Sequence, residues 1–328
     1  MPCGARARRV HPAAARGGER GSGATALTEP DPARGSSRRD GPAVALTALT
    51  RVVRMLGPLR RPVAAAVGAR WYARLAPADR VRAAANHHRM QPHLGYKDAA
   101  ALARRSYQEY VVMIVDSMWA EPLTSAQTLA KFQVWGEENL HVGDRAAMVV
   151  LPHFGNWDLA ASASLGLGLH LSTVMAPVVS PGITEMVALS RKRKGLEIFT
   201  VRQAARGLFR ALRRGRTVAL MLDVPEAGPT VVVPFCGGPV RCSAVPARLA
   251  AATGAAIIPV TCRRRRRGWV LEIHPAVSLD GDDAAVMSRV AAQVEPAIRA
   301  HPEQWYPFHH VYADREGARA LAEEAVRD

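Results

Sequence analysis

The sequence predicts an α/β fold with a mixed central sheet flanked by helices and preceded by an N-terminal helical segment. From residue 146 onward, short apolar runs alternate with longer segments of helical character, which is typical of strands and helices packed in layers. Residues 78–120 instead carry apolar side chains at helical spacing. The predicted strands cover residues 146–151, 171–176, 196–200, 217–222, 230–235, 256–262 and 269–273. The predicted helices of this part cover residues 156–168, 182–194, 203–214, 244–253 and 282–300.

The chain of 328 residues divides by composition into a tail and one large domain. Residues 1–45 are rich in Arg, Ala, Gly, Pro and Ser, with almost no large apolar residues, which predicts a disordered basic segment. They also lack the apolar core of a secretory signal, so we expect none. Residues 46–328 are expected to form the domain, helical over 46–120 and with an α/β core over 146–315.

Residues 45–73 interleave leucine, valine and alanine with five arginines. No stretch reaches the length of about 18 uncharged apolar residues that a transmembrane helix needs, so no membrane span is expected. The pattern suits a basic amphipathic helix that lies on an anionic bilayer. It suits equally a helix packed on the domain with its arginines in water.

The charge balance indicates an anionic partner. The chain carries 44 Lys and Arg against 28 Asp and Glu, a net charge of +16. Nucleic acid, anionic lipid and an acidic co-substrate such as coenzyme A or acyl carrier protein all fit this charge. The run Arg263–Arg267 is expected to be a solvated turn between two strands, with polyanion binding as the alternative. No RNA-recognition, zinc-finger or basic-zipper pattern accompanies it, which disfavours a nucleic-acid binder.

The four cysteines form no C-x-x-C pair and have no histidine partners at zinc spacing. We therefore expect reduced structural thiols and no metal site.

The most informative segment is residues 151–158, Leu-Pro-His-Phe-Gly-Asn-Trp-Asp, which follows a predicted buried strand. Asn156 is a good N-cap for a helix that begins at the next residue. His153 then lies in the turn and Asp158 in the first helical turn. A carboxylate there can hold one ring nitrogen of the imidazole and leave the other free as a general base. Backbone amides near Gly155 are candidate donors to an oxyanion.

The spacing H-x4-D alone does not identify the site, because it occurs three times in the chain. His93 and Asp98 lie in a segment with the character of a solvated loop. His309 and Asp314 lie in an aromatic C-terminal stretch that is expected to pack against the domain. Only His153 has a strand before it and a capped helix after it.

Two further segments suit an anion. Arg191 belongs to a basic cluster at the end of the predicted helix 182–194, where cations also complement the helix dipole. Its guanidinium could hold a phosphate by two hydrogen bonds. Ser243 can cap the helix 244–253, whose N-terminal amides could receive an anion.

The order of these motifs resembles the lipid A biosynthesis acyltransferase family, and especially its phosphatidylinositol mannoside acyltransferase branch. The resemblance covers roughly residues 50–315. Its motifs are His-Phe-Gly-Asn-Trp-Asp at 153–158, Arg-x-x-x-Gly at 191–195, Leu-Met-Leu-Asp at 220–223, Val-x-Phe-x-Gly-x-Pro at 233–239, Pro-Ala-Arg-Leu-Ala at 246–250 and His-Pro-Glu-Gln-Trp-Tyr at 301–306. The fold it implies is that of the glycerolipid acyltransferases.

The resemblance implies roles for single residues. His153 would be the general base and Asp158 the carboxylate that orients it. Arg191, Asp223 and Asn156 would contact the substrates. The mannoside branch has a glutamate where Val232 stands here, and Val224 replaces the usual polar residue after the aspartate. A second carboxylate would then be missing or supplied by Glu226.

The function that the resemblance implies is transfer of a fatty acyl group from an acyl thioester, acyl-CoA or acyl-ACP, to a hydroxyl of a glycolipid such as a phosphatidylinositol mannoside. No cofactor beyond that co-substrate is expected. The expected location is peripheral, on the cytoplasmic face of the plasma membrane, with anionic lipids as partners. The alternatives are an acyltransferase for a soluble polyhydroxyl product, favoured slightly by the missing glutamate, and a non-catalytic membrane-binding relative.

Overall fold

The computed structural model describes residues 41–143, 145–178, 180–223 and 228–313. The predicted disordered segment falls outside these ranges except for residues 41–45, which begin a helix. Glu226 and Val224, singled out in the sequence, also lie outside the described residues.

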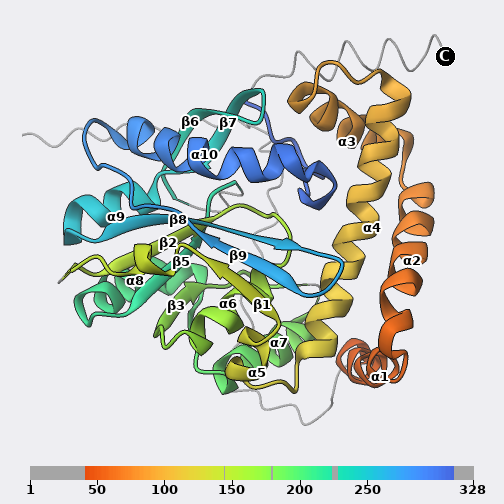
Figure 1. The fold of residues 1–328 in the computed structure, drawn as a ribbon, viewed down its shortest axis with the longest axis horizontal. Helices are drawn as coiled ribbons and strands as arrows, with labels where there is room; N and C mark the ends of the chain where they lie inside the picture. Colours follow the sequence, from red (N-terminus) through yellow and green to blue (C-terminus); the bar gives the residue numbers. More distant parts are fainter. Residues whose placement is uncertain (1–40, 144, 179, 224–227, 314–328) are drawn as a thin grey trace, which may run out of the picture. The chain divides into compact units, whose positions relative to one another are not determined.

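Every helix and strand predicted from residue 146 onward is present in the predicted order (Figure 1). The helices are α1 (Gly41–Met55), α2 (Arg60–Arg74), α3 (Pro77–Met90), α4 (Tyr96–Ala120), α5 (Ser125–Leu129), α6 (Trp157–Gly166), α7 (Pro181–Arg193), α8 (Ala204–Arg213), α9 (Val245–Thr253) and α10 (Asp283–Ala300). The strands are β1 (Phe132–Trp135), β2 (Ala147–Leu151), β3 (Leu171–Val174), β4 (Glu197–Phe199), β5 (Thr217–Met221), β6 (Thr230–Phe235), β7 (Gly238–Ser243), β8 (Ala256–Arg264) and β9 (Trp269–Ile273).

The described strands form a seven-stranded sheet in the order β1-β9-β8-β2-β5-β3-β4, and a separate hairpin, β6–β7. β8, β2, β5, β3 and β4 are parallel to one another. β9 pairs antiparallel with β8, and β1 is parallel to β9. The sheet is therefore mixed, as expected, with a parallel centre whose carboxyl ends share one edge. Such an edge is where open α/β sheets bind their ligands.

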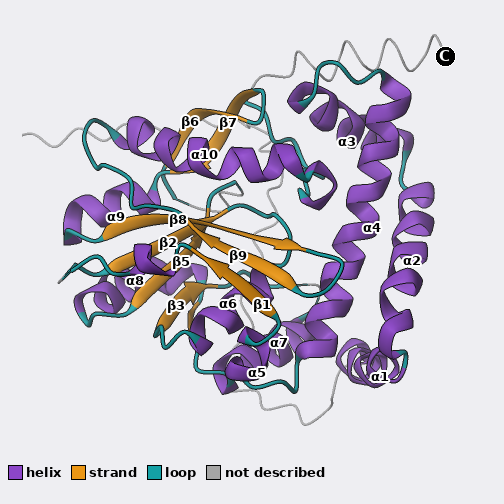
Figure 2. Cartoon of the chain, in the orientation of Figure 1, coloured by secondary structure: helices purple, strands orange, loops and turns teal. Residues whose placement is uncertain are grey.

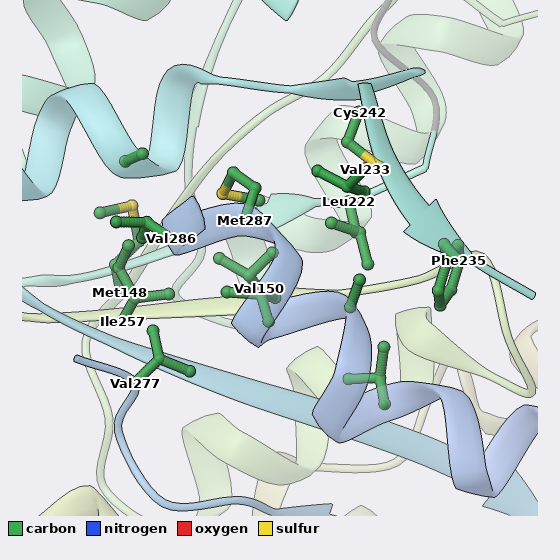
Figure 3. Packing of buried hydrophobic residues seen from close by; sticks show 14 of the residues in the cluster. Met148, Val150, Leu222, Val233, Phe235, Cys242, Ile257, Val277, Val286 and Met287 are labelled. Atoms are coloured by element: carbon green, nitrogen blue, oxygen red, sulfur yellow. The ribbon is translucent and has the colours of Figure 1, made fainter. Parts of the chain in front are cut away.

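β2 shows how the sheet divides the core, because its side chains alternate between two apolar clusters. Met148 and Val150 pack with α8, α9, α10 and the β6–β7 hairpin, whereas Val149 and Leu151 pack with α6 and the end of α4. Burial on both faces explains why a strand at the centre of a parallel sheet is a continuous apolar run. Figure 3 shows part of the first cluster, including Met148, Val150, Leu222, Val233, Phe235, Cys242, Ile257, Val277, Val286 and Met287.

The N-terminal helices form a layer beside the sheet, in which α2 and α4 lie side by side (Figure 2). Gly68 allows the close approach, since a Cβ there would lie 2.6 Å from the backbone of Gln108. Asp116 of α4 is fully buried and accepts hydrogen bonds from Arg60 and Arg61 at 3.0 and 2.9 Å. Burying a carboxylate is costly unless it is paired, so these contacts fix α2 on the domain. This supports the packed interpretation for that part of the N-terminal segment.

Within the described residues, no helix is long and apolar enough to cross a membrane. Cys236, Cys242 and Cys262 are buried free thiols, as expected for structural cysteines. Burial raises the pKa of Cys242 and of Cys262 to about 12, so both stay protonated and inert at neutral pH.

Candidate active site

The candidate site lies at the carboxyl edge of the sheet, where β2 and β5 end next to each other. The two strands are parallel, and Leu151 pairs with Met221 at their last residues. His153 and Asp223 each follow two residues later, so the register places them opposite one another. The strand pairing therefore brings together two side chains that are 70 positions apart in sequence.

His153 and Asp223 form a hydrogen-bonded pair. Nδ1 of His153 lies 2.8 Å from Oδ1 of Asp223. The backbone amide of His153 donates to both carboxylate oxygens at 3.0 Å. These contacts fix the ring, and a carboxylate at Nδ1 selects the tautomer in which Nδ1 carries the proton.

The environment of Asp223 keeps its carboxyl group ionised. Its side chain is 5 % exposed, and this burial by itself raises the pKa. The charge of the imidazole and the hydrogen bonds from the ring and amide of His153 outweigh burial, so the pKa of Asp223 lies below its ordinary value. The carboxylate is thus a permanent acceptor for His153 at neutral pH.

The other side of the imidazole is open. The His153 side chain is 26 % exposed, and Nε2 makes no hydrogen bond with the described part of the chain. Trp157 covers one side of the ring, with ring centroids 4.9 Å apart in a T-shaped contact. A half-buried ring that is held at Nδ1 and has no hydrogen bond at Nε2 among the described residues suits a general base.

Asp158 does not hold the imidazole, in contrast to the expectation from the sequence. Its Oδ1 instead lies 2.9 Å from both Nε and Nη2 of Arg191, at the end of α7. Asp158 lies in the first turn of α6, where its side chain faces α7. The carboxylate next to His153 is instead that of Asp223, which the pairing of β2 with β5 places beside it.

Arg191 is therefore part of a network of ion pairs at the end of α7. Arg193 lies 3.1 Å from Glu121, the first residue after α4, and Ser190 also donates to Glu121. Burial lowers the pKa of Lys194, with Asp158 and Glu121 acting in the opposite direction. The predicted basic cluster at the end of this helix is confirmed. Its Arg191 is linked to the candidate site by the ion pair with Asp158.

Asn156 is the N-cap of α6, as predicted, because its Oδ1 accepts from the amide of Leu159 at 2.9 Å. The same oxygen accepts from Ser117, and Nδ2 donates to the carbonyl of Met113, both on α4. With 1 % exposure and these three bonds, Asn156 anchors α6 on α4. The direct substrate contact expected from the sequence stays a prediction.

One of the loop amides expected to stabilise an oxyanion is already used. The amide of Gly155 donates to the carbonyl of Gln304 at 2.8 Å. Gly155 itself is required here, because it has a φ of +60° and a Cβ would lie 1.6 Å from the carbonyl oxygen of Cys262.

The other H-x4-D histidines have different surroundings. His93 is exposed, in agreement with a surface loop. The aromatic C-terminal stretch packs on the helical layer, with Phe308 stacked on Tyr107 at 3.8 Å. Burial lowers the pKa of His309, and Asp223 and His153 both act on it electrostatically, so its ring lies near the candidate site.

The arginine run is in part the expected solvated turn: Arg263 and Arg264 end β8, and the turn to β9 begins at Arg265. Arg264 forms an ion pair with Glu109 of α4 at 2.5 Å, and Arg265 donates to Gln133. Arg265, Arg266 and Arg267 are exposed. Val232, where the glutamate was expected, is 45 % exposed on β6.

Sequence reasoning placed Asp223 among the substrate contacts and missed its pairing with His153. The available signal was the equal two-residue offset of both residues from neighbouring strand ends. Among the described residues, no cluster of His, Cys, Asp or Glu has the arrangement of a metal site.

The family model described as bacterial lipid A biosynthesis acyltransferase matches residues 40–313. A phosphatidylinositol mannoside acyltransferase of Mycobacterium tuberculosis is 32% identical over 165 residues, 49% of this chain and 52% of that protein. Its namesake from Mycolicibacterium smegmatis is 29% identical over 167 residues, 49% of this chain and 55% of that protein. The chain thus spans about half the length of the relatives it matches.

Among solved structures, a 1-acyl-sn-glycerophosphate acyltransferase from Thermotoga maritima is 13% identical, with a TM-score of 0.37 over 80% of this chain and 98% of that one.

Proposed function

Because the chain belongs to the bacterial lipid A biosynthesis acyltransferase family, we propose that it transfers a fatty acyl group from an acyl thioester to a hydroxyl group, with His153 as the general base. The observation that carries the proposal is the His153–Asp223 pair, with Nδ1 bound at 2.8 Å and Nε2 open at the carboxyl edge of the sheet.

The reaction needs little beyond this pair. Nε2 of His153 accepts the proton of the acceptor hydroxyl as its oxygen attacks the thioester carbonyl. Asp223 stabilises the imidazolium that forms. The C–S bond then breaks, and the imidazolium returns the proton to the leaving thiolate, which restores the base. Thioesters are already activated, so positioning and proton transfer suffice and no covalent enzyme intermediate is required.

A glycolipid such as a phosphatidylinositol mannoside is the proposed acceptor, because the relatives carry that name. Arg191, held by Asp158 at the site edge, is the proposed contact for a substrate phosphate. The donor is proposed to be acyl-CoA or acyl-ACP. A second candidate acceptor is a soluble polyhydroxyl compound, because Val232 replaces the glutamate of the mannoside branch. Activity without vesicles would favour this acceptor.

Peripheral attachment to the cytoplasmic face of the plasma membrane is also part of the proposal. α1 and α2 expose apolar side chains that the domain leaves uncovered: Val44, Leu49, Val52, Met55, Val63, Val67 and Trp71. Arg51, Arg54 and Arg70 are exposed on the same helices. Apolar side chains beside arginines are what an anionic bilayer binds.

The test of catalysis is His153→Ala, assayed by release of coenzyme A from palmitoyl-CoA in the presence of vesicles that contain phosphatidylinositol mannoside. Loss of a general base lowers kcat by about two to four decades. His93→Ala, with the same H-x4-D spacing at an exposed position, is the matched control and keeps full activity. Turnover by His153→Ala at the wild-type rate would overturn the mechanism.

The test of membrane attachment is cosedimentation with vesicles. We expect binding to phosphatidylglycerol vesicles and little binding to phosphatidylcholine vesicles, with the difference reduced in high salt. Val52→Glu with Met55→Glu, on exposed positions of α1, should weaken binding and leave folding intact. Equal binding by this variant would rule out α1 as the attachment surface.

A further inference from the structure

The segment 302–308, named here the C-terminal strap, lies along the catalytic loop 152–156 like a neighbouring strand. Phe154 and Trp305 form an antiparallel β-bridge. The amide of Gly155 donates to the carbonyl of Gln304 at 2.8 Å. The amide of Tyr306 donates to the carbonyl of His153 at 3.3 Å. The backbone of the catalytic histidine is thus bound by Asp223 through its amide and by the strap through its carbonyl.

The side chain of Tyr306 adds a second contact to the same loop. Its hydroxyl donates to the carbonyl of Gly155 at 3.1 Å, and the residue is 6 % exposed. Burial raises the pKa of Tyr306, so the phenol stays protonated and remains a donor. Its ring also packs against Trp157 at 5.8 Å, and Trp157 in turn covers the ring of His153 at 4.9 Å.

The strap is fixed from outside the loop, which allows it to position the loop. The side-chain amide of Gln304 makes two hydrogen bonds with the backbone of Arg264, at 2.6 and 3.2 Å. The guanidinium of Arg264 is paired with Glu109 of α4. Asn86 of α3 donates to the carbonyl of Pro307 at 2.7 Å. Strand β8 and helices α3 and α4 therefore hold the strap.

We propose that Tyr306 is a positioning residue for acyl transfer, which sets the place of His153 through its hydrogen bonds to the carbonyls of His153 and Gly155. This inference rests on the proposed function of His153. The amide of His153 and its ring both bind Asp223, so a shift of the loop moves Nδ1 away from the carboxylate and turns Nε2 from its direction. A misplacement of about 1 Å in a catalytic group can cost roughly a hundredfold in rate.

The experiment compares Tyr306→Phe with Tyr110→Phe. Both changes delete one hydroxyl from the same aromatic cluster, where the rings lie 5.2 Å apart. Tyr306 is buried and Tyr110 is half-buried. The Tyr110 hydroxyl makes no hydrogen bond with the described residues, so it is a matched control. With palmitoyl-CoA and phosphatidylinositol mannoside vesicles, Tyr306→Phe should lower kcat by about tenfold or more and leave KM within about twofold. Tyr110→Phe should leave both constants within about twofold.

A second measurement separates positioning from a merely structural role. The proton between Nδ1 of His153 and Asp223 should give a low-field NMR resonance that His153→Ala abolishes. In Tyr306→Phe this resonance should shift or broaden, and in Tyr110→Phe it should not. Equal kcat values for the two variants, or an unchanged resonance in Tyr306→Phe, would overturn the inference.

The outcomes also separate this inference from the proposed function. Full activity of His153→Ala removes the proposed mechanism, and the resonance still tests whether the strap positions the ring. If Tyr306→Phe does not fold, Gln304→Met serves instead, because it deletes both side-chain bonds to Arg264 and keeps the bond from Gly155. The same fall in kcat and the same change in the resonance are expected, and wild-type values for both would overturn the inference.

Discussion

Two carboxylates flank the loop 152–156, and they have different partners. Asp223, after β5, is 5 % exposed and binds the ring and the amide of His153. Asp158, in the first turn of α6, is 33 % exposed and is paired with Arg191 of another helix. The carboxylate that is distant in sequence holds the imidazole of His153, and the one five residues away does not.

The difference shows that strand register is a stronger constraint than sequence spacing. Neighbouring parallel strands end together, so residues at the same offset beyond them meet, whatever their separation along the chain. A spacing of five residues across a loop and a helix start fixes no such direction, because the first helical turn decides where the side chain points. Asp158 accordingly faces α7.

The largest effect should come from Asp223→Asn. The amide keeps the shape of the side chain but presents both a donor and an acceptor, so it can hold His153 in the wrong tautomer. We expect kcat for palmitoyl-CoA turnover to fall by about four decades, by analogy with the same change of the orienting carboxylate in catalytic triads. Vesicles with phosphatidylinositol mannoside supply the acceptor.

Asp158→Asn is the matched control for that change, since it alters the other carboxylate that flanks the loop 152–156 without touching His153. It should lower kcat/KM by about tenfold or less, mainly through KM, because it releases Arg191 from its partner. If Asp158→Asn lowers kcat more than Asp223→Asn does, the roles assigned to the two carboxylates are wrong.

A smaller effect should appear in the pH dependence of stability. The pKa of Asp223 is lowered in the folded protein, so its contribution to stability is present above the unfolded value of about 4 and is lost as pH falls through the lower folded pKa. The gap in Tm between wild type and Asp223→Asn should therefore be widest near pH 7 and narrow below pH 4. Thermal unfolding followed by circular dichroism measures both curves.

His93→Gln, at an exposed position, is the control for this measurement. Its difference in Tm from wild type should not show the narrowing below pH 4 that is expected of Asp223→Asn. A gap for Asp223→Asn that stays constant from pH 7 to pH 3 would mean that the carboxylate gains nothing from its contacts with His153.

Most of the fold could be predicted from the sequence, because the core strands are continuous apolar runs. All seven predicted strands are present, and the helix after Asn156 begins where its cap predicts. The two strands that were missed are β1 and β7. β1 has four residues that alternate between half-buried and exposed at the sheet edge, and β7 begins with Gly-Pro, which is typical of a turn.

The site was less predictable, because its contacts join segments that are distant in sequence. His153 was identified from its context, whereas the partner of its ring follows only from the β2–β5 register. The role of Asn156 as a cap was visible, but its burial against α4 was not. Tyr306 gave no local signal, since its hydrogen bonds to the catalytic loop arise only after the strap has packed.

The central claim is that Asp223 binds Nδ1 of His153 and leaves Nε2 as the base. Nitrogen-15 NMR of histidine-labelled protein tests it directly, with the His153 signals assigned by their absence in His153→Ala. At a pH where the ring is neutral, the account predicts a protonated Nδ1 and a bare Nε2 in the wild type and in Asp158→Asn, with this tautomer lost in Asp223→Asn. A proton on Nε2 in the wild type, or a tautomer that depends on Asp158 and not on Asp223, would contradict it.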